Sequence, residues 1–104
     1  MKVVSVNTQN FDVVTNSEKP VFLDFYADWC GPCRTMAHIV DKIAEERTDI
    51  LVGKVNVADE PELARRFQVV SVPTFAVLEN GKVVERVTGV HSKSSLLSIL
   101  TRHV

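Results

Sequence analysis

The sequence predicts an α/β fold with three layers, in which a mixed sheet of five strands lies between four helices distributed over its two faces. Stretches typical of strands alternate with stretches that repeat apolar residues at helical spacing, which is the pattern of βαβ units. Towards the C-terminus two strand-like stretches flank Asn80-Gly81, a dipeptide that strongly favours a tight hairpin. The 104 residues, 45% of them hydrophobic, suit one compact domain over 1–104.

The first strands are predicted from runs of apolar and β-branched residues. We expect a short strand at 3–6, followed by a short helix that the side chain of Thr8 caps. The run 21–27 is almost entirely apolar, as in a central strand buried on both faces, and Asp24 is its one acidic residue.

A long helix is predicted after the central strand. Apolar residues recur at helical spacing from Met36 onward, so this helix is expected to begin near Pro32 or Cys33 and to end near Arg47. The next strand, over 51–57, is expected to pair in parallel with the central strand through a right-handed crossover.

The remaining predicted elements are a brief helix, two antiparallel strands and a final helix. Pro61 signals the start of the brief helix, which is expected to end near Phe67. The two strands cover 74–78 and 82–88. Ser92 is the expected cap of the last helix, whose apolar residues would cover one face of the sheet.

The charge balance excludes broad classes of function. The 12 basic and 13 acidic residues give a net charge of −1, which provides no electrostatic footprint for nucleic acid or an anionic membrane.

The N-terminal residues lack the apolar core of a signal peptide, and no later stretch has membrane-spanning length. We therefore expect a cytoplasmic protein, and nothing in the sequence requires more than a monomer.

Two cysteines, Cys30 and Cys33, lie where the central strand gives way to the long helix. A cysteine at a helix N-terminus faces unpaired N–H groups and the positive end of the helix dipole, which favour thiolate over thiol. Cys30 is therefore the expected nucleophile, with its thiol open to solvent. Cys33 lies one turn further on, within disulfide reach but sheltered, and is suited to resolve a mixed disulfide.

The same cysteine spacing could instead supply half of a structural zinc site, which needs four ligands. The remaining candidate ligands are His38, His91 and His103, and their spacing does not match a paired zinc motif. Redox chemistry is therefore the favoured interpretation, and we expect these histidines at the surface.

A larger ordered set of residues resembles the thioredoxin family over nearly the whole chain. The resemblance implies the thioredoxin fold and a thiol–disulfide oxidoreductase in which Cys30 attacks a protein disulfide and Cys33 releases the reduced product. The set consists of Asp24, the run Trp29-Cys30-Gly31-Pro32-Cys33, Lys54, Val72-Pro73-Thr74, Asn80-Gly81 and Gly89.

The resemblance also implies that Asp24 is a buried acid/base serving Cys33 through water, with Lys54 as its neighbour. Electrostatics agrees, because burial raises the pKa of a carboxyl group toward neutrality, where it exchanges protons easily with a thiol. The alternative is that Asp24 lies at a solvated strand edge or only pairs structurally with Lys54. We favour the catalytic role because the cysteines follow so closely.

A surface for binding substrate is implied around the cysteines. Pro73 matches the cis-proline of the family, which would pack beside the disulfide and expose the backbone of Val72 to an incoming peptide. With these two residues, the apolar docking surface would comprise Trp29, Gly31, Pro32 and Gly89.

Three residues depart from the family pattern. Tyr26 stands where many members have tryptophan, which should change the packing behind the site more than its chemistry. Ala58 stands where aspartate is frequent, which removes one polar contact near the site. His38 stands where the long helix commonly has a kinking proline, so this helix is expected to be straighter.

The leading hypothesis is a general protein-disulfide reductase that binds no cofactor itself. The chain contains no Gly-rich dinucleotide motif, and the resemblance implies that electrons arrive from NADPH and FAD through a partner, thioredoxin reductase. One alternative is a disulfide oxidant or isomerase, although Gly31-Pro32 matches the reducing branch. Another is a module that binds partners through the apolar rim without redox turnover.

Overall fold

The structure is a computed structural model that describes residues 2–103. Strands and helices alternate along most of the chain, and the last two strands follow one another directly. The elements are β1 (Val3–Ser5), α1 (Phe11–Thr15), β2 (Val21–Tyr26), α2 (Gly31–Glu46), β3 (Leu51–Asn56), α3 (Pro61–Arg66), β4 (Thr74–Glu79), β5 (Lys82–Thr88) and α4 (Lys93–Thr101).

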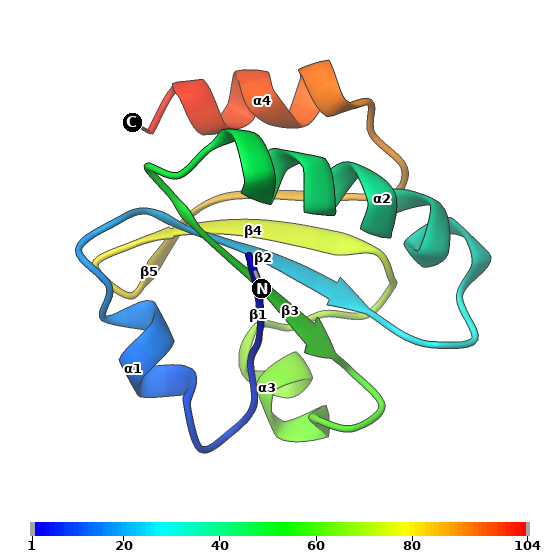
Figure 1. Cartoon of the computed structure of the whole chain (residues 1–104). Helices are drawn as coiled ribbons and strands as arrows, with labels where there is room; N and C mark the ends of the chain where they lie inside the picture. Colours follow the sequence, from blue (N-terminus) through cyan, green and yellow to red (C-terminus); the bar gives the residue numbers. More distant parts are fainter. Residues whose placement is uncertain (1, 104) are drawn as a thin grey trace.

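The five strands form one mixed sheet in the order β1-β3-β2-β4-β5. The strands β1, β3 and β2 pair in parallel, while β4 is antiparallel to both β2 and β5. Helices α2 and α4 cover one face of the sheet, and α1 and α3 cover the other (Figure 1). The predicted three-layer α/β architecture is therefore confirmed.

The central strand β2 supplies side chains to both apolar cores. Successive residues of a strand point to opposite faces, so Phe22 packs with α2 and α4, whereas Leu23 and Phe25 pack with α1 and α3. Phe22 stacks on Phe75 of β4 with ring centroids 5.7 Å apart. Asp24 shares the face of Phe22 and is thereby directed toward the layer that contains α2.

The turn between β4 and β5 has the predicted hairpin geometry. Asn80 and Gly81 both have positive φ, at 53° and 77°. These angles suit the type I′ turn, whose twist matches that of the flanking strands, and asparagine and glycine adopt them more readily than other residues. Ser92 also caps α4 as expected, because its Oγ accepts a hydrogen bond from the Ser95 N–H at 3.1 Å.

One detail of the predicted helices is wrong. Helix α1 begins only at Phe11, so Thr8 does not cap it; the backbone and hydroxyl of Thr8 instead donate to Glu60. The N-terminal turn is formed by Asn7 and Asn10, each of whose backbone N–H donates to the side chain of the other. Helix α2 spans Gly31–Glu46, in agreement with the predicted start near Pro32 or Cys33 and the predicted end near Arg47.

The lengths and compositions of the helices also bear on membrane insertion. Within residues 2–103, none of the helices combines the length and the apolar character needed to cross a bilayer.

Candidate active site

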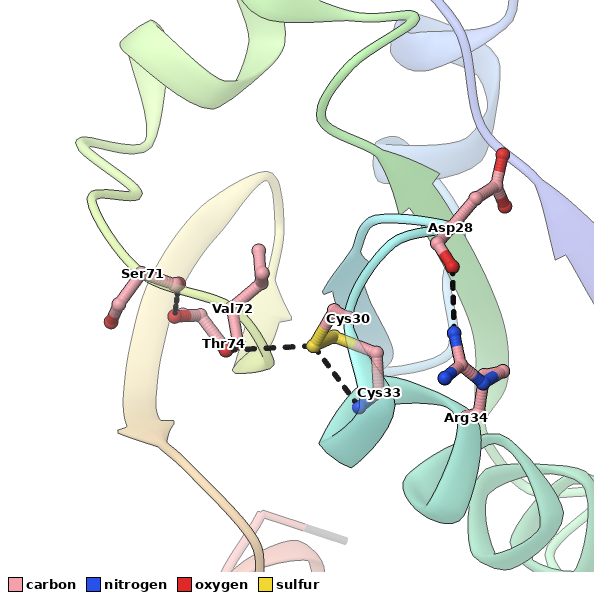
Figure 2. Close-up of a disulfide and its surroundings, with 7 residues drawn as sticks. All are labelled: Asp28, Cys30, Cys33, Arg34, Ser71, Val72 and Thr74. Carbon is pink, nitrogen blue, oxygen red and sulfur yellow. Dashed lines mark hydrogen bonds between the residues drawn. A yellow bond between two sulfur atoms is a disulfide. The ribbon is translucent and has the colours of Figure 1, made fainter.

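Cys30 and Cys33 are joined in a disulfide at the N-terminus of α2, with their Cα atoms 5.3 Å apart. Cys30 is the N-cap residue, and Cys33 lies in the first turn. The backbone N–H of Cys33 donates to Cys30 Sγ at 3.1 Å (Figure 2). In the reduced protein the same N–H and the helix dipole are placed to stabilise negative charge on Cys30, which is the expected nucleophile.

The local sequence explains why the helix begins at this point. Pro32 lies in the first turn, where the absence of a backbone N–H removes no intrahelical hydrogen bond. No acidic side chain is present in that turn, so the turn itself adds no negative charge that would oppose a thiolate at Cys30. The strand, the tight connection and the helix start therefore together define the position of the sulfur atoms.

The expectation that Cys30 is open to solvent is wrong for this disulfide form. Cys30 is 5% exposed and Cys33 is 3% exposed, so the two residues are covered almost equally. Both pack with Ala27, and the side chain of Val72 lies against this small cluster. Trp29, by contrast, is 74% exposed beside the disulfide.

The segment before β4 forms the wall facing Cys30 (Figure 2). The carbonyl oxygen of Val72 lies 3.8 Å from Cys30 Sγ, although a disulfide sulfur carries no proton to donate. The Val72–Pro73 peptide bond is cis, which is the isomer that the resemblance implies. The hydroxyl of Thr74 donates to the carbonyl of Ser71 at 2.7 Å and so ties this segment to the start of β4.

The six predicted docking residues lie on the two sides of the disulfide. Trp29, Gly31 and Pro32 come from the start of α2 and the residue before Cys30. Val72 and Pro73 come from the facing segment, and the N–H of Gly89 donates to the Pro73 carbonyl at 2.9 Å. Trp29 and Pro32 are exposed, Gly31, Val72 and Gly89 are partly buried, and Pro73 is buried.

Asp24 and Cys33 line the same pocket, which has a volume of about 170 Å³. Asp24 is only 4% exposed, and its Oδ1 has no hydrogen-bond partner among residues 2–103. Burial raises the pKa of this carboxyl group from 3.8 to about 7; the charge of Lys54 opposes the rise and that of Asp41 adds to it. The solvated strand edge considered as an alternative for Asp24 is therefore wrong.

Lys54 is the neighbour of Asp24 on the adjacent strand but does not form a close ion pair with it. The two residues are register partners between β2 and β3, and both line the pocket. Among the described residues, no nitrogen of Lys54 lies within 4.0 Å of a carboxylate oxygen. The Lys54 ammonium lies over the ring of Tyr26, 6.0 Å from its centroid.

Four residues that line the pocket were not among the sequence-based candidates. They are Ala27, Asp28, Arg34 and Ala37, and Arg34 Nη1 donates to the Asp28 carbonyl at 2.8 Å (Figure 2). Their positions next to the C-x-x-C run were the only available signal. Two of the atypical residues lie outside the pocket. They are His38 on α2 and Ala58 after β3, and both are exposed.

The two other histidines differ in their surroundings. His91 is partly buried, and its Nε2 lies 2.9 Å from the Thr88 carbonyl oxygen. The side chain of His103 is 17% exposed and approaches Glu79 at 3.7 Å and Glu85 at 3.4 Å. Over residues 2–103, no group of three or more His, Cys, Asp or Glu side chains is arranged to hold a metal ion.

Comparisons with known proteins agree with this geometry. The sequence model of the family described as Thioredoxin matches residues 2–102. A thioredoxin from Mycobacterium tuberculosis is 47% identical over 89 residues, which cover 85% of this chain and 77% of the relative. A bifunctional thioredoxin reductase/thioredoxin from Mycobacterium leprae is 45% identical over 92 residues, or 88% of this chain and 20% of that protein.

A solved structure shows the same likeness in three dimensions. A single-residue mutant of thioredoxin from Halobacterium salinarum NRC-1 superposes with a TM-score of 0.91 and 34% sequence identity, over 97% of this chain and 89% of the other. A match of the family model to nearly every residue, joined to this fold and to the disulfide at the start of α2, shows that the chain belongs to the thioredoxin family.

Proposed function

We propose that this chain reduces protein disulfides, with Cys30 as the attacking thiolate, Cys33 as the resolving thiol and Asp24 as the group that accepts the proton of Cys33. The observation that carries the proposal is the disulfide at the N-terminus of α2, which lies beside a pocket that also contains a buried carboxyl group. Membership of an oxidoreductase family that acts on disulfides supports it.

The reaction transfers two electrons from the dithiol to a client disulfide. The Cys30 thiolate attacks one client sulfur, forming a mixed disulfide, and the other client sulfur leaves as a thiolate that takes a proton from solvent. The Cys33 thiol loses its proton and attacks Cys30 Sγ. The bond between Cys30 Sγ and the client breaks, the client sulfur leaves as a thiolate that takes a second proton from solvent, and the Cys30–Cys33 disulfide remains beside the released dithiol.

Asp24 is suited to assist the second step. Its carboxyl group and Cys33 line the same pocket, which is large enough to hold water between them. Because its pKa is about 7, the group can accept a proton near neutral pH and give it up again. Lys54, on the neighbouring strand, would limit the rise in this pKa and so keep the exchange reversible.

Client proteins would bind across the disulfide. We propose that Trp29, Gly31 and Pro32 contact the client from one side, while Val72, Pro73 and Gly89 contact it from the other. The exposed ring of Trp29 offers apolar area, and the free backbone of Val72 can pair with an extended peptide.

Electrons would come from a partner protein. We propose a thioredoxin reductase that carries FAD and draws on NADPH; the Mycobacterium leprae relative, whose name joins both activities in one polypeptide, supports this choice. We further propose that residues 1–104 form a single domain that acts as a monomer in the cytoplasm, where client thiols are kept reduced.

The proposal is tested by NADPH-driven reduction of insulin in the presence of a thioredoxin reductase. We expect catalytic turnover by the wild type, none by Cys30→Ser, and accumulation of a mixed disulfide by Cys33→Ser, detected by mass spectrometry. Arg65→Gln is a suitable control, because Arg65 is exposed and its one ion pair within residues 2–103 is with Glu62. Full turnover by the Cys30→Ser variant would overturn the proposal.

A further inference from the structure

The segment that faces the disulfide is exposed along most of its outer side. Residues 67–73 connect α3 to β4 without regular hydrogen bonding. Within this segment Val70 is 97% exposed, whereas Phe67 and Val69 pack partly against the core. Such a segment needs polar restraints as well as apolar ones to hold Val72 at a fixed distance from Cys30.

The beginning of the segment is held by backbone hydrogen bonds to α3, among them Val69 N–H to the Ala64 carbonyl at 2.9 Å, and by the side chain of Arg86 of β5. The guanidinium group donates from Nη1 to the Phe67 carbonyl and from Nη2 to the Gln68 carbonyl, the latter at 2.8 Å. These carbonyls follow the last turn of α3, where backbone acceptors lack intrahelical partners. A planar guanidinium can bind both at once, which a single ammonium cannot do in the same geometry.

The backbone at this point has an unfavourable conformation that the arginine helps to hold. Gln68 has a φ of 54°, in the left-handed region that residues with a Cβ rarely adopt. Across residues 2–103, no carboxylate lies within 4.0 Å of Arg86, so its guanidinium is committed to these carbonyls. The turn at Gln68 sets the direction in which the chain leaves α3.

The far end of the segment is fixed to the same pair of strands. Gly89, just after β5, donates to the Pro73 carbonyl, and Thr74 of β4 donates to the Ser71 carbonyl. Arg86 is itself a register partner of Ala76 on β4. The segment is therefore tied at both ends to the β4–β5 hairpin, and Arg86 is the side chain that fixes the distant end.

We propose that Arg86 is a positioning residue for client binding, and that its two hydrogen bonds hold residues 68–72 in the conformation that presents Val72 to an extended peptide. The proposal rests on the proposed function, because it assigns this segment to the client. It concerns protein clients, which need contacts along the segment. A small aromatic disulfide needs only access to the sulfur of Cys30.

The test uses Arg86→Gln and Arg86→Lys, each reduced beforehand and mixed with insulin or with a small aromatic disulfide in stopped flow. Trp29 is the only tryptophan of the chain and lies beside the disulfide, so its fluorescence follows oxidation without a reductase. We expect the insulin concentration for half-maximal rate to rise about tenfold in Arg86→Gln, with the maximal rate and the small-disulfide rate unchanged.

Arg86→Lys keeps the charge near the end of α3 but cannot bind both carbonyls in the same fork, so we expect it to give a smaller rise in the same quantity. The control is Arg65→Gln, which should leave both substrates unaffected, and urea unfolding establishes that every variant is folded. Unchanged insulin kinetics in both Arg86 variants, or equal losses for insulin and the small disulfide, would overturn the inference. A wild type that reduces the small disulfide but not insulin would refute the proposed function instead.

Discussion

A single buried carboxyl group, that of Asp24, links the chemistry of the site to the stability of the protein. In the unfolded chain the group loses its proton near pH 3.8, whereas in the folded protein it keeps the proton until about pH 7. The folded pKa is the higher one, so the folded state binds more protons than the unfolded state between these values. Stability therefore falls as the pH rises from 3.8 to about 7 and is constant above that range with respect to this group.

The variant Asp24→Asn removes this pH dependence. We expect the free energy of unfolding of the variant, relative to wild type, to increase by up to about 4 kcal/mol between pH 4 and pH 8. A buried amide has its own unmet hydrogen bonds at every pH, so the change with pH is the informative quantity. Urea unfolding of the oxidised proteins measures it.

The exposed carboxylate of Asp59 provides the matched control for that experiment. The difference in free energy of unfolding between Asp59→Asn and the wild type should be the same at pH 4 and at pH 8. If Asp24→Asn also shifted stability equally at both values, burial would not be raising the pKa of Asp24.

Individual residues show where sequence reasoning succeeds and where it stops. Burial of Asp24 could be predicted because a lone acid in an apolar run has few alternatives. The equal covering of Cys30 and Cys33 could not, because it depends on Val72 from a distant part of the chain. Neither could the contact of Arg86 with the turn at Gln68, which joins residues 18 positions apart.

At the scale of elements, local signals were reliable where one residue type has a specific structural role. Asn80-Gly81 predicted the hairpin because both positions need positive φ. The prediction from Thr8 was wrong because a side chain that can cap a helix can equally form a hydrogen bond elsewhere, and the Thr8 hydroxyl donates to Glu60. Gly53 gave no signal in the sequence, yet a Cβ there would come within 2.8 Å of the side chain of Val6.

The N-terminus of α2 should make Cys30 an unusually acidic thiol. Cys30 Sγ accepts the N–H of Cys33 at 3.1 Å and lies at the positive end of a helix of 16 residues. We expect its pKa in the reduced protein to lie below that of a free thiol, because the Cys33 N–H and the helix dipole stabilise the thiolate. Ultraviolet absorbance of the thiolate during a pH titration measures this value.

The titration needs variants that leave one ionising group at the site. Asp24 also ionises near pH 7, and coupled groups give apparent pKa values that belong to neither alone. The double variant Cys33→Ser with Asp24→Asn isolates the Cys30 thiol, and the urea-unfolded form of the same protein is the control. Equal pKa values in the folded and unfolded forms would show that the helix terminus has no effect.

At the scale of the whole molecule, the redox site lies at the edge of two separate apolar cores. One core fills the space between the sheet and α2 with α4, and the other lies between the sheet and α1 with α3 (Figure 1). Because β2 contributes to both, its C-terminal end and the start of α2 are held by the whole fold. The same folded framework therefore surrounds the disulfide and the dithiol. The relative stability of the two forms, and with it the reduction potential, depends on the entire protein.

The reduction potential therefore distinguishes a reductase from a disulfide oxidant or isomerase. The positive end of the α2 dipole favours the thiolate and so stabilises the reduced form. The disulfide restricts the unfolded oxidised chain and so stabilises the folded oxidised form. Gly31-Pro32 between the cysteines matches thioredoxins, whose reduction potential is ~−270 mV, against ~−180 mV for protein disulfide isomerase. The difference corresponds to about 4 kcal/mol for two electrons. Equilibration with glutathione or a dithiol buffer, followed through Trp29 fluorescence, measures the potential. A value near that of the isomerase would mean that the stabilised thiolate outweighs the cross-link, and this chain would then oxidise its clients.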